Sequence, residues 1–209
     1  MFLSKKDIEG RVKELFPVDS LFDAQRLNEA SYDLRVGDEV YLSENQIPTR
    51  LGPDSPYVVL PPGQFALVKT YEEIRIPRDL IGLLSIRSKF KFQGLINISG
   101  FHVDPTYTGN LIFSVQNVGP NDIRLKYLEP VFMLMWANLL TKYEGKERAP
   151  GYSRIQLEHM AQLGGPSVTL AGLKRDLDRL SLALKIYGAL GIALFGIILA
   201  AILRWLKPS

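Results

Sequence analysis

Apolar and polar positions follow three different patterns along the 209-residue chain, and the first lies at the N-terminus. There the apolar positions recur at the spacing of one helix face: Ile8, Val12 and Leu15. Ser4 can cap such a helix, and Asp7 stands three residues later as a capping-box partner. The pattern predicts a short helix over residues 3–16.

The middle of the chain consists of short β-type runs separated by turn residues. The runs are Tyr57–Leu60, Gln64–Thr70, Gly82–Ser88, Leu111–Asn117 and Val131–Trp136. Proline- and glycine-rich turns lie between them, without βαβ alternation or a glycine-rich phosphate loop. Many short strands at this spacing are typical of a sandwich or barrel, so we expect a mainly β head with distorted, jelly-roll-like pairing.

The third pattern is an uncharged run of apolar residues near the C-terminus, from Ile186 to Leu203. As a helix it would be about 27 Å long, close to the hydrocarbon thickness of a thin bilayer. Lys185 precedes the run and Arg204 follows it, with Trp205 at interfacial depth. The alternative is a buried core helix. We predict a single transmembrane helix over residues 186–205 that serves as a C-terminal anchor.

Leucines before this run step by three and four residues, as in a heptad seam: Leu170, Leu173, Leu177, Leu180 and Leu184. The seam indicates a parallel coiled coil that enters the membrane, or one amphipathic helix lying on the head. Gly164-Gly165-Pro166 would mark the domain boundary. The expected organisation is a head over residues 1–163, a hinge and stalk over 164–185, and the transmembrane helix over 186–205.

The amino-acid composition limits the kinds of reaction and partner that the chain can have. The chain is 46% hydrophobic, carries a net charge of only +3, and contains no cysteine and two histidines. A zinc-type nucleobase deaminase is excluded because it needs cysteine ligands. The small charge gives no reason to expect a nucleic-acid partner. The N-terminus lacks the apolar core of a signal peptide, so a cytoplasmic head is expected.

Several segments contain more polar and charged residues than a β core needs. They are LSKKDIEG, ASYDLRVG, VLPPGQFALVKTYEEIRIP, the Arg87-Ser88 turn, GFHVDPTYTGN, FSVQNVGPNDIRL and KYEGKERAPGYSR. Together and in this order, over residues 1–154, they resemble the dCTP deaminase/dUTPase superfamily, in particular its dCTP deaminase branch. The resemblance implies homotrimers with sites between subunits and a pyrimidine deoxynucleoside triphosphate bound with Mg²⁺, without a direct protein ligand to the metal.

The resemblance also assigns site residues by matching motifs. Arg87 and Ser88 fall on the turn that holds phosphates, and Lys89 adds charge there or is a solvated surface residue. Asp104 falls on the aspartate that contacts the deoxyribose 3′-hydroxyl and positions water in dUTPases. The remaining matches are Gly100 in the hairpin that reads the pyrimidine, Tyr107 against sugar or base, Asp33 in the first motif, and Lys142, Tyr143 and Lys146 in the segment that closes over the triphosphate.

Two departures from the family pattern affect deamination. The family places a glutamate in the strand after the GN-type turn, and this chain has Ser114 there. The final, catalytic arginine of the phosphate turn is Phe92, and the second serine of that turn is Lys89. Deaminating cytosine without a metal requires a carboxylate that takes a proton from water and passes it on, which a serine hydroxyl does not do near neutral pH.

These observations leave three functions open. One is a membrane-anchored, trimeric nucleotide-binding pseudoenzyme that senses a pyrimidine deoxynucleotide and passes its bound state to the membrane helices. The second is an active dCTP deaminase or dUTP pyrophosphohydrolase, in which Asp104, Arg87 and Lys142 would meet the demands of hydrolysis. The third is a scaffold with a vestigial pocket.

Overall fold

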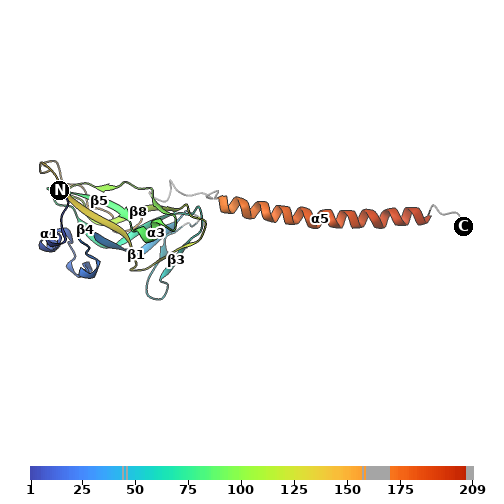
Figure 1. The fold of residues 1–209 in the computed structure, drawn as a ribbon, viewed down its shortest axis with the longest axis horizontal. Coiled ribbons are helices and arrows are strands. Elements are labelled where there is room, and N and C mark those ends of the chain that lie inside the picture. Colours follow the sequence, from blue (N-terminus) through green and yellow to red (C-terminus); the bar gives the residue numbers. More distant parts are fainter. Residues whose placement is uncertain (44, 46, 157, 159–169, 206–209) are drawn as a thin grey trace. The chain divides into compact units, whose positions relative to one another are not determined.

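The computed structural model describes residues 1–43, 45, 47–156, 158 and 170–205 (Figure 1). The chain divides into two compact units, Met1–Ser167 and Val168–Ser209. The first unit is a mainly β head, and the described part of the second is one long helix. The predicted boundary at Gly164–Pro166 lies outside the described residues.

The head begins with two short helices in place of the single predicted one. They are α1 (Lys5–Gly10) and α2 (Val12–Leu15), followed by the 3-10 turns η1 (Asp19–Leu21) and η2 (Ala24–Arg26). The capping box is confirmed, because the Asp7 amide donates to Ser4 Oγ and the Ser4 amide donates to the Asp7 carboxylate at 2.9 Å. The prediction of one continuous helix is wrong: α1 ends at Arg11, whose guanidinium pairs with Asp79 at 2.9 Å.

After these turns, the described part of the head contains ten strands. They are β1 (Tyr32–Leu42), β2 (Thr49–Arg50), β3 (Tyr57–Leu60), β4 (Phe65–Arg75), β5 (Leu80–Ile86), β6 (Leu95–Asn97), β7 (His102–Val103), β8 (Thr108–Asn117), β9 (Ile123–Lys126) and β10 (Pro130–Asn138). The predicted run Tyr57–Leu60 is confirmed to the residue. The run Gly82–Ser88 is wrong at its end, because β5 stops at Ile86 and Ser88 opens the short helix α3 (Ser88–Lys91).

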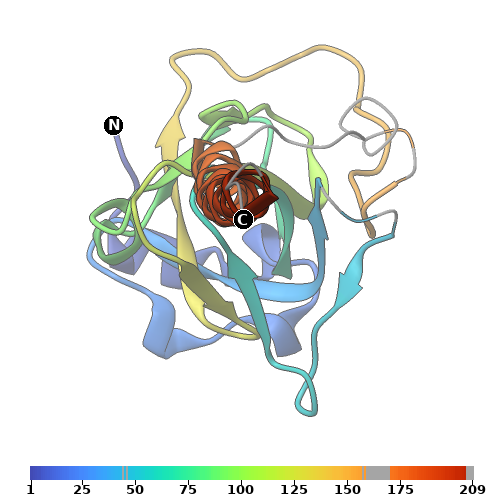
Figure 2. The same cartoon turned by 90° about the vertical axis from the view of Figure 1, so that its right-hand side faces the viewer.

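The long strand β1 joins the two halves of the β structure. Its first part pairs with β10, its second part pairs with β4, and the register shifts between Leu34 and Arg35 and again between Val36 and Val40. Eight strands therefore form one bent sheet in the order β6-β8-β4-β1-β10-β5-β7, with β2 beside β1. β3 and β9 pair separately. The result is a half-barrel whose strands wrap around the core (Figure 2).

The core lies between the two parts of the bent sheet. The rings of Phe113 on β8 and Phe132 on β10 stack with centroids 3.8 Å apart, and Trp136 is fully buried. β8 alternates buried and half-buried residues along its length, as a strand with one face on the core does. This alternation directs Phe113 and Val115 inward, and Ser114 therefore projects from the other face.

A buried ion pair fixes the bend of the sheet. Arg35 Nε lies 2.6 Å from the carboxylate of Glu72, which has no exposed surface, and the Arg35 amide donates to the same carboxylate at 2.8 Å. Arg35 also lies over the ring of Tyr71. Burial raises the pKa of Glu72, and the hydrogen bonds from Arg35 oppose that rise. The ion pair therefore links β1 to β4.

The second unit contains helix α5 (Leu170–Trp205), a single continuous helix of 36 residues (Figure 1). An 18-residue window within its stretch Gly172–Ala200 has a mean hydropathy of 2.2, so the helix meets the length and composition expected of a membrane span. The described leucines of the seam are exposed, from 49% for Leu173 to 66% for Leu184. The long helix is thus confirmed, and its assembly into a coiled coil stays a prediction.

Candidate functional site

The first part of the candidate site is the end of β5, where Arg87 follows the last residue of the strand. Arg87 Nε lies 3.0 Å from Asp33 Oδ2, and Nη1 donates to the carbonyl of Pro130 at 3.2 Å. Asp33 is buried on β1, and this burial raises its pKa while the charge of Arg87 opposes the rise. The Arg87 side chain remains 37% exposed, so part of the guanidinium is available to an anion.

The residues after Arg87 form the short helix α3 and carry the altered motif. Lys89 Nζ pairs with Glu129 at 2.8 Å, and Lys91 Nζ donates to Ser85 Oγ at 2.8 Å. Ser88 is exposed, and Phe92 is 89% exposed at the position where the family has an arginine. The turn therefore presents one fixed cation, Arg87, while the charge of Lys89 is already directed to an acid of the same chain.

The second part of the site lies around Asp104, directly after β7. Oδ1 of its carboxylate lies 3.4 Å from His102 Nε2, and Oδ2 accepts a hydrogen bond from the guanidinium of Arg148. The Arg148 amide donates to Thr106 Oγ1 at 3.1 Å. Thr106 has a φ of 69°, a left-handed conformation that is uncommon for a β-branched residue. Both oxygens of Asp104 thus have partners within the chain.

Tyr107 lies between the Asp104 loop and β8. Its hydroxyl donates to the carbonyl of Asn110, and burial raises its pKa to about 12. Gly151 approaches the ring so closely that a Cβ atom there would come within 2.5 Å of Tyr107 Cζ. The tyrosine is therefore covered by a segment that is distant in sequence. Gly100 is exposed, with open space around its Cα, and it lies in a loop rather than the expected hairpin, because β6 pairs with β8 and β7 pairs with β5.

Residues 142–155, which we call the strap, have little regular structure but follow the head closely. Arg78 Nη1 donates to the carbonyl of Gly145 at 2.9 Å, and the Gly151 amide donates to the carbonyl of Thr108 at 2.7 Å. Further along, Lys69 Nζ donates to the carbonyl of Ser153 at 3.0 Å.

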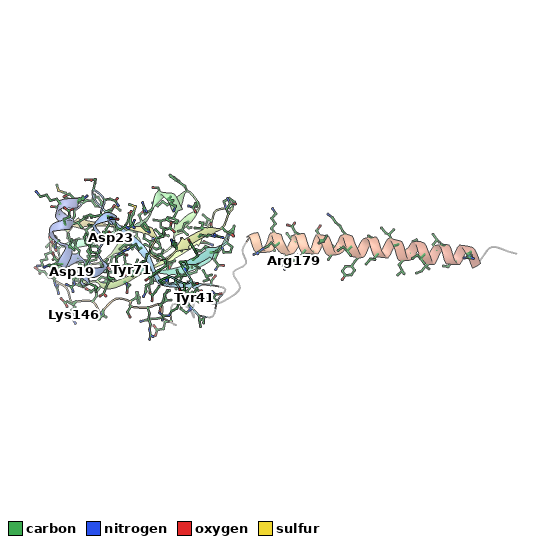
Figure 3. The ribbon with its side chains drawn as sticks, turned by 90° about the horizontal axis from the view of Figure 1, so that it is seen from below. Asp19, Asp23, Tyr41, Tyr71, Lys146 and Arg179 are labelled. Carbon is green, nitrogen blue, oxygen red and sulfur yellow. The ribbon has the colours of Figure 1, made fainter. Side chains whose placement is uncertain are left out.

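At its C-terminal end the strap contacts the head through Ile155. The Ile155 amide donates to Glu39 Oε2 at 2.8 Å, and its side chain packs in a buried cluster with Tyr41 and Leu67. Lys146, near the start of the strap, and Tyr41, at its end, are labelled toward opposite ends of the head in Figure 3. The strap therefore runs along the head from the Asp104 loop to β1 and β4.

A cleft of about 470 Å³ opens beside the strap. It is lined by residues of both charges together with threonine hydroxyls: Glu14, Arg75, Arg78, Asp79, Thr106, Thr108, Lys142 and Glu147. Arg11 holds the pKa of Asp79 below its usual range, with a smaller contribution from Lys142. Of the three strap residues assigned from sequence, Lys142 lines this cleft, Tyr143 donates its amide to the Arg78 carbonyl at 2.8 Å, and Lys146 is exposed.

Ser114 lies on β8, on the face away from the core. Its amide donates to Ser99 Oγ at 3.3 Å, and its carbonyl accepts from the Ile98 amide at 2.7 Å. Both partners belong to the loop that carries Gly100, so the serine lies beside the segment predicted to read a pyrimidine. The side chain at this position is half-buried and has no ionisable group.

The two parts of the site are not adjacent within one chain. Because β7 pairs antiparallel with β5 through Gly82 and Val103, Asp104 comes level with Ile81, near the start of β5. Arg87 follows the other end of that strand, about 20 Å away along its direction. The structure thus brings Arg87 to Asp33 and brings Asp104 to Tyr107 and the strap, but it does not bring the two groups together.

The sequence patterns missed Arg148, Thr106 and Gly151. Arg148 is a single arginine in an irregular segment rich in glycine and proline, and no periodicity distinguishes it from Arg154 nearby. Its role follows only from the backbone path that returns the strap to the Asp104 loop. The positive φ of Thr106 gives no sequence signal either, since glycine or asparagine would be expected at such a position.

Comparison with known proteins identifies a family and several relatives of this chain. A family model described as dCTP deaminase-like matches residues 2–137. The dCTP deaminase of Thermococcus kodakarensis is 35% identical over 141 residues, covering 67% of this chain and 86% of that protein. The dUMP-forming dCTP deaminase of Methanosphaera stadtmanae is 25% identical over 203 residues, covering 84% of this chain and 95% of that protein.

Solved structures show the same fold. The 2′-deoxycytidine 5′-triphosphate deaminase of Agrobacterium tumefaciens superposes with a TM-score of 0.52 at 17% identity, and the match covers 65% of this chain and 48% of that one. The mainly β half-barrel of the head therefore has the fold of a solved dCTP deaminase. By sequence, the chain belongs to the dCTP deaminase-like family.

Proposed function

We propose that this chain binds a pyrimidine deoxynucleoside triphosphate without deaminating it, and that it acts as a membrane-anchored nucleotide sensor or effector. The observation that carries the proposal is Ser114. Deamination needs a group that moves a proton from water to the ring and the departing amine. Beside the Gly100 loop, β8 offers a serine hydroxyl at the position of the family's glutamate.

The binding residues are retained while this proton carrier is not. Arg87, oriented by buried Asp33, would pair with phosphate oxygens, since a guanidinium matches their geometry. Asp104 would accept the sugar 3′-hydroxyl, and Tyr107 would pack against the sugar or base. The class of this ligand is inferred from relatives that are named dCTP deaminase.

A homotrimer with shared sites is part of the proposal. The separation of about 20 Å between Arg87 and Asp104 along β5 favours a site in which one copy supplies the phosphate contact and another supplies the sugar contact. Exposed apolar residues near α3 and β6 provide a surface for such packing: Phe92, Ile96, Ile98 and Val118.

Magnesium would enter with the triphosphate. The described residues contain no group of three or more aspartate, glutamate or histidine side chains that could hold an ion. Asp33 and Glu129, the acids that contact the phosphate turn, are already paired with Arg87 and Lys89. Phosphate oxygens would therefore supply the ligands, and the ion would neutralise part of the phosphate charge.

Helix α5 supplies the proposed anchor. Placing two aspartates in its span, by Ile192→Asp and Ile197→Asp, should cost about 2.5–3.5 kcal/mol each and abolish flotation of the full chain with phosphatidylcholine vesicles. Lys174→Asp, which also adds an acid but lies outside the uncharged run, serves as the control. Flotation of the doubly substituted chain would show that α5 does not insert.

Hydrolysis of dUTP is the second candidate, because Asp104, Arg87 and Lys142 are all present for it. The deciding experiment incubates the purified full chain in detergent with dCTP or dUTP and Mg²⁺, and follows ammonia, pyrophosphate and binding heat. We expect saturable dCTP binding with neither product. Ammonia from dCTP would overturn the proposal in favour of an active deaminase, and pyrophosphate would favour the hydrolase.

A further inference from the structure

The first half of α5 exposes a line of leucines on a segment that also carries charges. We propose that this leucine stripe, made of Leu173, Leu177, Leu180 and Leu184, packs against the same stripe of further copies of the chain, in parallel and in register, just outside the bilayer. The inference rests on the proposed function, because the anchor sets the direction of the helix. It gives the chain an assembly element that is separate from the head.

The first support is the length of α5 compared with that of its uncharged run. The helix has 36 residues and is about 54 Å long, whereas the uncharged run, residues 186–203, accounts for about 27 Å and is enough to cross the hydrocarbon. Residues 170–185 add about 24 Å. Their charged side chains are costly in hydrocarbon: Lys174, Arg175, Asp176, Asp178, Arg179 and Lys185. This segment therefore lies outside the membrane core, where the leucines meet water.

The continuity of α5 decides between lipid and protein as the cover for these leucines. An amphipathic helix that rests on a membrane surface lies in the plane of the bilayer. A segment joined to a spanning helix without a break instead continues in the direction of the span. α5 is continuous from Leu170 to Trp205, and no proline interrupts it. The leucine stripe therefore points away from lipid and needs a protein surface to cover it.

A further copy of the chain is the cover that the spacing favours. Copies that insert through the same tail run in the same direction and reach the same depth, so identical leucines come level with each other. Steps of three and four residues place these leucines at both core positions of a heptad, which is the narrow stripe of a coiled coil. A helix that packs on a globular domain has a wider apolar face.

The residues beside the stripe are compatible with parallel copies. The positions that flank the core of such a bundle hold Lys174 and Asp176, followed by Ser181 and Ala183 in the next heptad. In a parallel pair, the flanking residue after one core position faces the flanking residue of the following heptad on the neighbouring helix. Asp176 therefore faces Ser181 and not another carboxylate.

Because the chain contains no cysteine, disulfide crosslinking tests the stripe directly. Single cysteines are placed in the full chain, incorporated into phosphatidylcholine vesicles, by Leu177→Cys and Leu180→Cys on the stripe and by Leu182→Cys on the opposite face of the helix. Leu182 is the matched control, because it is 60% exposed and the other two are 57% and 59% exposed. After oxidation with Cu²⁺-phenanthroline, non-reducing electrophoresis measures the crosslinked fraction.

We expect a crosslinked fraction about fivefold higher for Leu177→Cys and Leu180→Cys than for Leu182→Cys. Identical core positions of parallel helices approach within the Cα separation of about 4.4–6.8 Å that a disulfide spans, whereas residues on the opposite face do not.

Flotation of the same vesicles separates this inference from the anchor. Chains that float but crosslink equally at the three positions would overturn the leucine stripe and leave the anchor standing. A higher crosslinked fraction for Leu182→Cys would also overturn the stripe, because the copies would then meet through the other face. Chains that fail to float would overturn the proposed anchor, and this inference with it.

Discussion

The two ends of the candidate site are held in opposite ways. At the phosphate end, a half-exposed cation, Arg87, is fixed by a buried acid of the sheet, Asp33. At the sugar end, a half-buried acid, Asp104, is held by a cation, Arg148, on an irregular strap. The first arrangement leaves donors of a cation for a ligand, whereas in the second the carboxylate already accepts a hydrogen bond from Arg148.

The difference teaches which end of the site is ready before a ligand arrives. Because Arg87 is positioned by groups on β1 and β10, a phosphate contact requires no rearrangement of the sheet. At the sugar end, Asp104 accepts a hydrogen bond from Arg148, whose side chain is 54% exposed and lies on an irregular segment. We therefore expect the phosphate end to be the more firmly positioned of the two before a ligand binds.

The largest effect on nucleotide affinity should come from removing Arg87, the cation at the phosphate end. Arg87→Ala deletes charge-assisted hydrogen bonds worth about 1.5–3 kcal/mol, so dCTP affinity should fall about a hundredfold. Isothermal titration calorimetry with Mg²⁺ measures it, and Arg124→Ala, an exposed arginine on β9, controls for the loss of one charge. A loss of affinity equal to that of the control would remove Arg87 from the site.

The next effect concerns the fixed end of the strap. Ile155→Ala removes a buried side chain from its cluster with Tyr41 and Leu67 and should lower the free energy of unfolding by about 2 kcal/mol. Urea unfolding measures this loss. Ile47→Ala, at a position 72% exposed, should cost almost nothing. If both substitutions cost the same, Ile155 is not an anchor.

A smaller effect should appear in the pH dependence of stability. Burial raises the folded-state pKa of Asp33 above its unfolded value, so the native state retains this proton longer. The contribution of Asp33 to stability is therefore present at low pH and is lost as pH rises from about 4 through the folded pKa. Asp33→Asn should remove that decline, and urea unfolding from pH 4 to 7 measures it.

Calorimetry on the same Asp33→Asn variant tests whether Asp33 positions the phosphate end of the site. If Asp33 orients Arg87, dCTP binding weakens although the arginine remains. Unchanged affinity would mean that the Pro130 carbonyl alone is enough to hold the guanidinium in place.

The smallest effect should come from the exposed pair at the sugar end. Asp104→Asn keeps the shape of the side chain and removes the charge that Arg148 faces, so the Gly151 amide should exchange about two- to threefold faster. Added salt should produce a similar change in the unsubstituted chain and little change in the variant, because it screens exposed charges. Salt-insensitive exchange in both proteins would show that the charge pair does not hold the strap.

The sequence predicts the head best where a single local rule is sufficient. The capping box at Ser4 and the strand Tyr57–Leu60 follow from short patterns, and both are present. β1 was not predicted as a strand, although it is among the longest, because it carries charged residues on both sides of its pleat. Asp33 and Glu39 are buried there only because Arg87, Arg50 and the Ile155 amide reach them from distant segments.

The same reason separates the predicted site residues from the missed ones. Arg87 and Asp104 stand in motifs whose order along the chain resembles a family. The contacts between Arg148 and Asp104, and between Gly151 and Tyr107, depend on where an irregular segment returns to the sheet. Neither periodicity nor turn chemistry specifies such a return, because long-range hydrogen bonds fix it.

The strap also crosses three neighbouring strands of the sheet. It bonds to Thr108 on β8, to Lys69 on β4 and to Glu39 on β1. Because a different strand holds each contact, the strap acts as a cross-link over the sheet, and a chain cut between Gly151 and Ser153 would leave both cut ends bonded to the head.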